Sequence, residues 1–192
     1  ITFARHSLLI TFHPVTLEPE ECKSQMKELL SALSSLSDTT LIFTMPNADS
    51  GGRELMTLIN HFVTEHKDAF VFTSLGQMKY FSCIEHVDGV IGNSSSGLTE
   101  VPTFLKGTIN IGNRQKGRIQ AESVINCDSN KIDIERAITE LYSLEFQRKL
   151  PFVTNPYGDG GASSRIVSIL REYDISRGTT KQFCDQNNKE MQ

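Results

Sequence analysis

The chain has 192 residues, of which 38% are hydrophobic and 22% are charged. A chain of this length can bury its own core, and its composition excludes disordered, collagen-like and coiled-coil proteins. The formal net charge of -4 argues against a general nucleic-acid binder, whose binding face usually makes the domain basic. No apolar run approaches the length of a membrane span. The sequence therefore predicts a globular protein that does not cross a membrane.

The cysteines indicate a reducing environment. Cys22, Cys83, Cys127 and Cys184 are far apart and form no CxxC pair, so neither a zinc site nor a disulfide framework is predicted. Reduced thiols in a cytoplasmic protein are the simpler interpretation. The sequence begins with Ile1 and has no signal-peptide features, and we therefore expect it to be part of a longer protein.

Short apolar runs recur along the chain, and most are continuous rather than alternating, which is typical of strands covered on both faces. They lie at 8–12, 41–45, 69–73, 89–92, 108–111 and 123–127. Helical patterns lie between them at 22–36, 55–62, 78–87, 98–106 and after Asn130, a plausible N-cap. Strands that alternate with helices predict an α/β fold with a doubly wound parallel sheet of about six strands.

The C-terminal part differs in composition from the rest. A Gly- and Pro-rich loop at 151–162 precedes an amphipathic segment at 166–170, which we expect to pack away from the main sheet. Beyond Tyr173 the chain is polar. The predicted organisation is one domain at residues 1–174 and a polar C-terminal tail at 175–192, which is loose unless a partner holds it.

Ligands of doubly wound sheets bind at the carboxyl ends of the strands, and two loops there suit an anion. In the serine loop, residues 92–97, Ser94 and Ser95 belong to a run of three hydroxyls before a predicted helix, an arrangement that suits phosphate. The alternative is that Ser95 or Ser96 only caps the helix, which requires one hydroxyl rather than three. Phosphate binding is the stronger interpretation, and the two are compatible.

The second loop is the basic loop, residues 112–118, with Arg114, Lys116 and Arg118. Arg114 could hold a diphosphate through a two-pronged contact, and the alternative is a solvated basic turn. Two adjacent loops that both suit anions favour the phosphate interpretation. Neither is a Walker motif and no GxGxxG follows a strand, which argues against an ATPase and a dinucleotide dehydrogenase.

Four further residues lie where predicted strands end, and a fifth, Glu100, lies two residues inside the helix predicted after the serine loop. Glu100 could accept the hydroxyls of a ribose or could be only a first-turn acid favoured by the helix dipole. His13 could contact phosphate or act in acid–base chemistry, although a lone histidine at a strand end is more often structural. Asn47 and Asp49 are turn residues by default, and backbone groups near Ser74 could contact the edge of a base.

Taken in order, these motifs resemble the hydrolysing UDP-N-acetylglucosamine 2-epimerases. They are LLITFHPVT at 8–16, MPNAD at 45–49, GNSSSG at 92–97 with Glu100, and NIGNRQKGR at 110–118. The resemblance spans nearly all of residues 8–170 and covers only the second half of those enzymes, which have two Rossmann-like domains in the GT-B arrangement. It implies that this chain is the C-terminal, UDP-binding half and that the N-terminal domain is missing.

The resemblance also implies roles for the candidate residues. The base would lie near Ser74, the ribose at Glu100 and the diphosphate at Ser94, Ser95 and Arg114, with His13 as the catalytic residue and with Asn47 and Asp49 lining the cleft. The implied reaction eliminates UDP across C1 and C2 of the sugar and adds water with inversion at C2, giving N-acetylmannosamine for sialic-acid-type sugar synthesis. The proton-moving carboxylates would come mostly from the missing domain, so the chain alone is expected to be inactive.

No cofactor and no metal are implied. The expected partners are UDP, a UDP-amino-sugar substrate, the missing N-terminal domain and, at full length, further copies in a homo-oligomer. A diacetamido-trideoxy UDP-sugar of the legionaminic acid route is an alternative substrate, and the donor-binding half of a GT-B glycosyltransferase is an alternative function. A non-catalytic flavodoxin-like module would need an acidic cluster after its first strands, and His13 followed by Pro14 argues against it.

Overall fold

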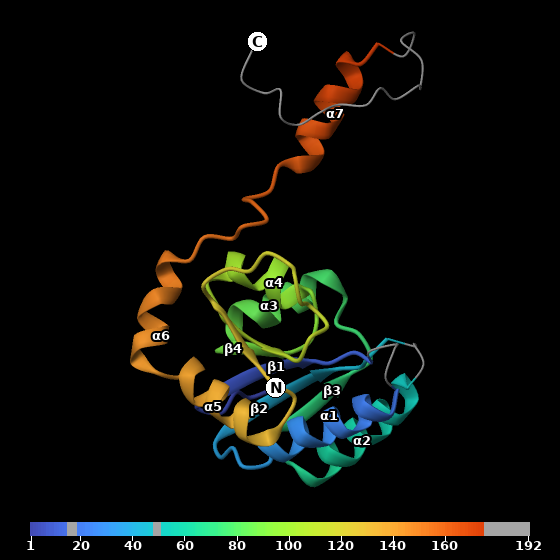
Figure 1. The fold of residues 1–192 in the computed structure, drawn as a ribbon, viewed down its shortest axis with the longest axis vertical. Coiled ribbons are helices and arrows are strands. Elements are labelled where there is room, and N and C mark those ends of the chain that lie inside the picture. The colour runs from blue at the N-terminus through green and yellow to red at the C-terminus, as the bar shows by residue number, and fades with distance from the viewer. Residues whose placement is uncertain (15–18, 48–50, 175–192) are drawn as a thin grey trace. The chain divides into compact units, whose positions relative to one another are not determined.

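The computed structural model describes residues 1–14, 19–47 and 51–174. It separates into two compact units, Ile1–Gly158 and Asp159–Gln192, and the first contains the sheet shown in Figure 1. The expected domain boundary at residue 174 stays a prediction, because residues 175–192 lie outside the described part. None of the described helices has the length and apolar composition of a membrane span.

The first unit is built on a six-stranded sheet in which all neighbouring strands are parallel, in the order β3-β2-β1-β4-β5-β6. The strands are β1 (His6–Thr11), β2 (Thr39–Thr44), β3 (Ala69–Phe72), β4 (Gly89–Gly92), β5 (Gly107–Ile111) and β6 (Val124–Cys127). The doubly wound α/β prediction is confirmed, and each strand lies close to its predicted position.

The strand order reverses beside β1. The chain moves outward from β1 through β2 to β3 and then returns to place β4 on the other side of β1. Ligands of doubly wound folds bind at such a reversal. Because Thr11 pairs with Gly92 there, the residues that follow these two strands lie side by side.

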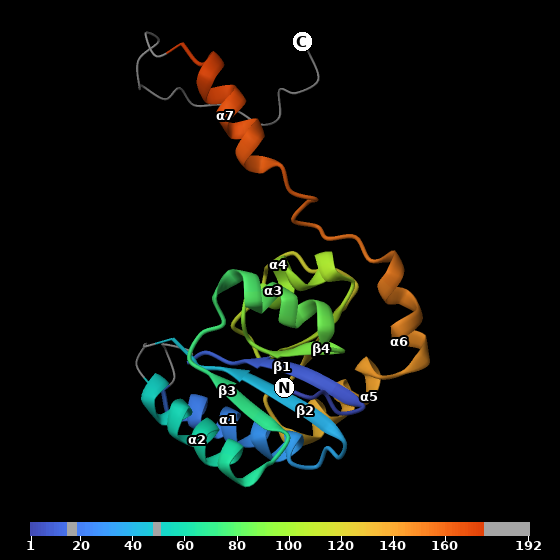
Figure 2. The same ribbon diagram turned by 180° about the vertical axis from the view of Figure 1, so that it is seen from behind.

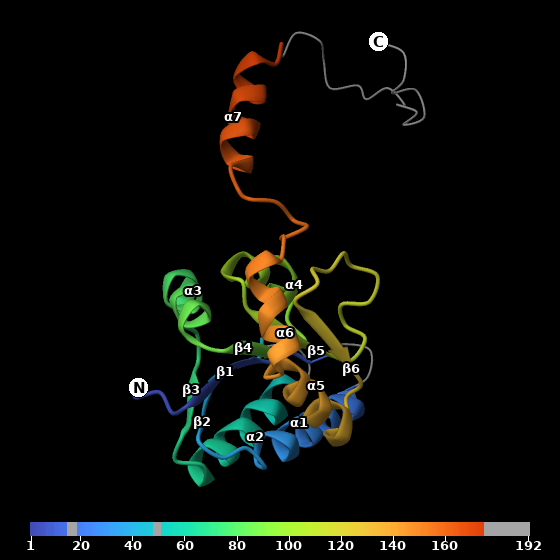
Figure 3. The same ribbon diagram turned by 90° about the vertical axis from the view of Figure 1, so that its left-hand side faces the viewer.

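Helices cover both faces of the sheet, as Figures 2 and 3 show. One face carries α1 (Pro19–Leu33), α2 (Gly52–Glu65) and α5 (Lys131–Leu141), and the other carries α3 (Gly76–His86), α4 (Ser96–Thr99) and the 3-10 helix η1 (Val101–Phe104). After α5 come α6 (Leu144–Lys149) and the 3-10 helix η2 (Leu150–Phe152). The larger core cluster includes Met26, Leu29 and Ile138, and the smaller includes Leu9, Ile84 and Val101.

The predicted helix at 98–106 is not a single helix. α4 ends at Thr99, and η1 begins after Glu100. Pro102 has no backbone N–H to donate to the carbonyl four residues earlier, so a continuous α-helix is broken here. The chain continues as one 3-10 turn and ends it at Leu105, whose φ is 55°.

The described part of the second unit contains α7 (Ala162–Glu172). Its sequence is amphipathic, as predicted, but none of its residues is buried. The apolar side chains of Ile166, Val167, Ile169 and Leu170 are all exposed. What α7 packs against stays a prediction.

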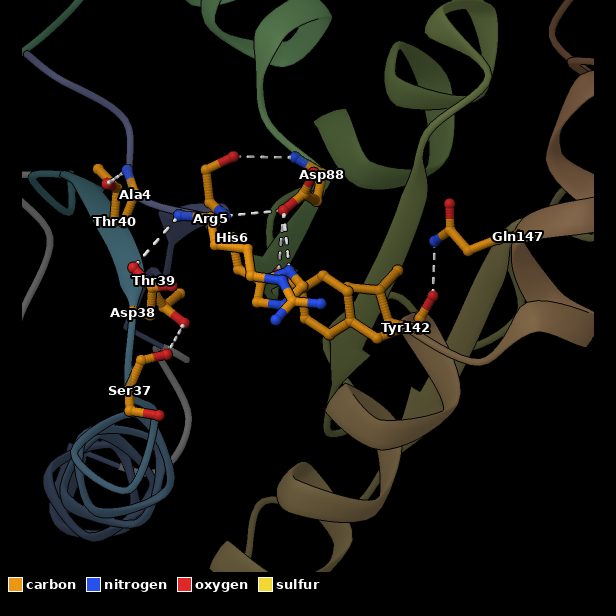
Figure 4. Close-up of polar contacts among 12 residues, drawn as sticks. Ala4, Arg5, His6, Ser37, Asp38, Thr39, Thr40, Asp88, Tyr142 and Gln147 are labelled. Atoms are coloured by element: carbon orange, nitrogen blue, oxygen red, sulfur yellow. Dashed lines mark hydrogen bonds and ion pairs between the residues drawn. The ribbon is translucent and has the colours of Figure 1, made fainter.

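A polar cluster lies at the amino-terminal edge of the sheet, where β1 and β4 begin (Figure 4). This edge is opposite the strand ends that carry the candidate loops. Asp88 accepts the backbone N–H of Ser7 at 2.7 Å and the hydroxyl of Tyr142 at 3.3 Å. Nδ1 of His6 lies 3.7 Å from the same carboxylate, and the His6 and Tyr142 rings meet edge-on. The cluster therefore joins the starts of β1 and β4 to the end of α5.

Replacing Tyr142 with phenylalanine is expected to lower the free energy of unfolding by about 1 kcal/mol, because a hydrogen bond to a partly exposed carboxylate is lost. Urea denaturation at neutral pH measures this. Tyr157→Phe is the control: Tyr157 is exposed and its hydroxyl donates to the Ile119 carbonyl, so less than about 0.5 kcal/mol is expected there. Equal losses in the two variants would contradict a stabilising role for Asp88.

The same pair of proteins, wild type and Tyr142→Phe, tests a pH dependence. Burial, and then the Asp88 carboxylate, raise the pKa of Tyr142 above its usual value. A pKa that is higher in the folded state stabilises the fold below the unfolded-state pKa of about 10, and this contribution is lost as the pH rises further. The stability difference between the two proteins should therefore shrink above about pH 10.

Candidate functional site

A pocket of about 530 Å³ opens at the carboxyl ends of β2 and β3. Its lining comes from the segments after these strands, from the start of α3 and from one acid after α4: Thr44, Met45, Pro46, Asn47, Thr73, Ser74, Leu75, Gly76, Gln77, Tyr80, Phe81 and Glu100. Three of the predicted site residues, Asn47, Ser74 and Glu100, therefore lie around one cavity. The predicted phosphate ligands lie in loops outside this lining.

Glu100 lines the pocket from the junction between α4 and η1. The hydroxyl of Ser96 donates to its Oε2 at 2.5 Å, which holds the carboxylate in place. The alternative of a first-turn acid is wrong, because Glu100 follows the last residue of α4 instead of lying in its first turn. Its position beside a cavity is consistent with a ligand-binding acid.

The serine loop leaves β4 in a sharp turn. Ser95 lies at the N-cap of α4 but makes no side-chain capping bond, and the Ser96 hydroxyl is bound to Glu100. N-capping by Ser95 or Ser96 is therefore not the role of these hydroxyls. The hydroxyl of Ser94 accepts the Ser96 backbone N–H only at 3.4 Å. Phosphate binding by Ser94 and Ser95 stays a prediction.

The cationic side chains of the basic loop lie in two different places. Nη1 of Arg114 donates to the backbone carbonyl of Asn93 at 3.1 Å, and Nε2 of Gln115 donates to the same oxygen at 2.8 Å. Lys116 and Arg118 instead line a separate pocket of about 500 Å³ at the ends of β5 and β6. The structure thus brings Arg114 to the serine loop but leaves the other two cations outside it.

His13 follows β1 and is held through both its backbone and its ring. The side chain of Asn93 accepts the His13 backbone N–H at 2.7 Å and donates to the His13 carbonyl at 2.8 Å. The backbone N–H of Asn47 donates to Nδ1 of the ring at 3.3 Å, so the neutral imidazole carries its proton on Nε2. His13 and Asn47 therefore lie together, whereas Asp49 falls outside the described residues.

Ser74 begins the turn between β3 and α3. Its hydroxyl accepts the backbone N–H of Gly76 at 3.1 Å, and Gly76 has a φ of 63°, a conformation that favours glycine. Ser74, Leu75 and Gly76 all line the pocket. This turn and Glu100 therefore border the same cavity, while base binding at the turn stays a prediction.

Three residues at this edge were not predicted as part of the site: Tyr80, Asn93 and Gln115. The buried hydroxyl of Tyr80 makes no hydrogen bond of normal geometry to any of the described residues. Burial raises its pKa, although the side chains of Ser96 and Thr11 act to lower it. Tyr80 lies one helical turn after Gly76, and this spacing could have placed it beside the pocket. Asn93 has only the weaker signal of directly following a buried strand.

The described residues hold no group of three or more His, Cys, Asp or Glu side chains that could bind a metal ion.

A family model described as UDP-N-acetylglucosamine 2-epimerase matches residues 2–171. The chain belongs to this family. The resemblance noted in the sequence is therefore confirmed at the level of the family.

Two relatives are more than one-third identical to this family member. One is the GDP/UDP-N,N'-diacetylbacillosamine 2-epimerase (hydrolyzing) of Campylobacter jejuni, 37% identical over 180 residues, and the other is the polysialic acid biosynthesis protein P7 of Escherichia coli, 36% identical over 179. Each match covers 92% of this chain and 46% of the relative. The chain thus spans about half the length of these relatives.

Solved structures of epimerases have the same fold. A putative UDP-N-acetylglucosamine 2-epimerase from Listeria monocytogenes matches with a TM-score of 0.67 at 19% identity, covering 86% of this chain and 45% of that one. A Staphylococcus aureus MnaA–UDP structure matches with a TM-score of 0.67 at 20% identity, covering 88% and 45%. This family member therefore has the fold of about half of a GT-B-type epimerase.

Proposed function

We propose that this chain is the UDP-binding half of a hydrolysing 2-epimerase that acts on a UDP-linked 2-acetamido sugar. The observation that carries the proposal is the pocket at the ends of β2 and β3, with a turn of exposed backbone on one side and the oriented carboxylate of Glu100 on the other. Its size suits a nucleoside. Family membership and the names of the relatives give independent support.

In this proposal each part of the nucleotide has its own residues. The base contacts the turn at Ser74, and the ribose hydroxyls donate to Glu100. The diphosphate extends toward the reversal of the strand order, where Ser94 and Ser95 donate hydrogen bonds and Arg114 supplies positive charge. The catalytic role is given to His13, next to the phosphate and the sugar, with Asn47 and Asp49 along the cleft.

The proposed reaction eliminates UDP across C1 and C2 of the sugar and then adds water to the resulting 2-acetamidoglucal with inversion at C2. The acids that move the protons are assigned to a domain outside this chain, because the described residues around the pocket include one acid, Glu100. The chain alone is therefore expected to bind nucleotide without turning over a UDP-sugar.

Two sugars compete as the substrate. UDP-N-acetylglucosamine, which would give N-acetylmannosamine for sialic acid synthesis, is supported by the family description and by a Neisseria meningitidis relative of that name, 30% identical. UDP-N,N'-diacetylbacillosamine is supported by the names of the C. jejuni relative and of a Legionella pneumophila relative, 29% identical. Incubating the full-length enzyme with each UDP-sugar and identifying the released free sugar distinguishes them, and transfer to an acceptor would instead indicate a glycosyltransferase.

Two further assignments belong to the full-length protein. We propose that it forms a homo-oligomer, which sedimentation of the full-length enzyme would test. We also propose that it acts in the cytoplasm, since Cys83 and Cys127 are free thiols and such thiols suit a reducing compartment. Cys184 lies outside the described residues.

Calorimetric titration of the chain with UDP, UMP, GDP and ADP tests the proposed function. We expect UDP to bind more tightly than ADP, with a dissociation constant above about 1 μM because half of the enclosing cleft is absent. GDP is included because one relative's name contains both nucleotides. Equal binding of all four compounds, or no binding of UDP, would contradict the proposal.

Arg114→Ala is expected to weaken UDP binding about tenfold and uridine binding less than twofold, because only UDP offers a diphosphate to the guanidinium. The UDP effect should decrease at high salt, since Arg114 is exposed and its charge is screened. Arg118→Ala, in the same loop but lining the other pocket, is the control and should leave UDP binding unchanged. A uridine effect as large as the UDP effect would contradict a phosphate contact.

A further inference from the structure

One buried asparagine joins the loops that carry the proposed phosphate ligands. Asn93 is 1% exposed and is the first residue after β4. Its side chain makes two hydrogen bonds to the backbone of His13. Its backbone carbonyl accepts hydrogen bonds from the side chains of Arg114 and Gln115. The ends of β1, β4 and β5 are therefore connected through a single residue.

The two side-chain hydrogen bonds have short distances and complementary directions. The amide oxygen of Asn93 accepts the His13 N–H at 2.7 Å, and the amide nitrogen donates to the His13 carbonyl at 2.8 Å. Together they fix the backbone of His13 relative to β4. Only a side chain with one donor and one acceptor on the same planar group can make both bonds.

The backbone carbonyl of Asn93 binds side chains of the basic loop. Its carbonyl oxygen accepts from Nη1 of Arg114 at 3.1 Å and from Nε2 of Gln115 at 2.8 Å, and Gln115 is itself 1% exposed. The network extends through the His13 ring to the backbone N–H of Asn47. Asn93 is 1% exposed and its amide is bound to the backbone of His13, so any effect on a ligand must act through its neighbours.

We infer that Asn93 is a positioning residue, which holds His13 and Arg114 in one fixed arrangement around the diphosphate of the nucleotide. This inference rests on the proposed function, because it takes the diphosphate as the group that the two side chains share. Without the amide, the His13 backbone loses both of its bonds to β4, and the ring is no longer fixed relative to Arg114. The loss of binding affinity is then expected for ligands that carry the diphosphate and not for the nucleoside.

The test compares Asn93→Ala with Asn110→Ala by calorimetric titration of the chain with UDP and with uridine. Asn110 is a matched control: it lies on β5, is 3% exposed, and its amide donates one hydrogen bond to Asn126 at 2.8 Å. We expect Asn93→Ala to weaken UDP binding about tenfold and uridine binding less than twofold. The control should change both affinities by less than twofold.

A double-mutant cycle shows whether Asn93 acts through His13. In a His13→Ala background, adding Asn93→Ala should weaken UDP binding much less than it does in the wild type, because part of what it positions is already gone. Full additivity of the two substitutions would overturn the inference. So would an equal loss of UDP and uridine affinity in Asn93→Ala, which would indicate a structural role only.

The NMR signals of the His13 imidazole provide a readout that needs no nucleotide. Their chemical shifts should change in Asn93→Ala and remain the same in Asn110→Ala. Unchanged chemical shifts in Asn93→Ala would overturn the inference. If Asn93→Ala does not fold, Asn93→Asp serves in its place, since it keeps the acceptor for the His13 N–H and removes the donor. A wild-type chain that fails to bind UDP contradicts the proposed function, and the imidazole signals still decide on Asn93.

Discussion

Gly92→Ala is expected to lower the free energy of unfolding by about 3 kcal/mol or more, a large fraction of the stability of an ordinary domain. Gly92 has a φ of 144°, which a side chain rarely tolerates, and a Cβ placed there would lie 2.0 Å from the carbonyl oxygen of Thr11. That oxygen belongs to the backbone of the neighbouring central strand. It can move away only if the pairing of β1 with β4 is disrupted.

Urea denaturation of Gly92→Ala and Gly117→Ala measures the effect. Gly117 also has a positive φ, 83°, but a Cβ there would have no atom of the described residues within 4 Å. It therefore isolates the conformational cost, about 1 kcal/mol, from the contact with the neighbouring strand. Similar losses in the two variants would show that the close approach of Gly92 to Thr11 adds nothing to the cost.

Glu100→Gln is expected to weaken the binding of UDP and of uridine by the same factor, between about 10-fold and 150-fold. Removing a charged hydrogen-bond partner costs about 1.5–3 kcal/mol, and in the proposed site Glu100 contacts the ribose that both ligands share. Glutamine has the same shape and keeps an oxygen that can accept from Ser96. The loss therefore reports the charge, measured by calorimetric titration.

2′,3′-Dideoxyuridine diphosphate separates a ribose contact from a general loss of affinity. It has no ribose hydroxyls, so its binding should be equal in the wild type and in Glu100→Gln. Glu85→Gln on α3 is the control variant, since Glu85 is exposed and does not line the pocket. If Glu100→Gln binds UDP as tightly as the wild type, the assignment of Glu100 to the ribose is wrong.

The fold could largely be predicted because its strands are covered on both sides. Every residue of β2 is buried, and a strand in that position needs a continuous apolar run, which is a strong sequence signal. The break between α4 and η1 was harder to predict, because the apolar residues around it still follow a helical spacing. Only Pro102, a single residue, carries the information that the helix cannot continue.

The candidate site was less predictable, because its contacts depend on residues far apart in sequence. His13 and Asn93 are separated by 80 positions, and their pairing follows from the register of β1 against β4, which no local pattern encodes. The cations of the basic loop are close in sequence, but Arg114 contacts Asn93 while Lys116 lines a different pocket. The chemical type of each loop was therefore predictable, but the partner of each side chain was not.

The strand order also determines what the growing chain exposes during synthesis. β1 is made first, but it lies in the middle of the sheet, with Leu8 paired to Leu41 on one side and to Gly89 on the other. Until β4 has been translated, the apolar strand β1 forms an open edge, and such edges pair readily with strands of other chains. Pauses in translation between β3 and β4 are therefore expected to prolong the period in which newly made chains can aggregate through β1. Once β4 pairs with β1, the open edge passes to β4 and then to β5, until β6 has been made.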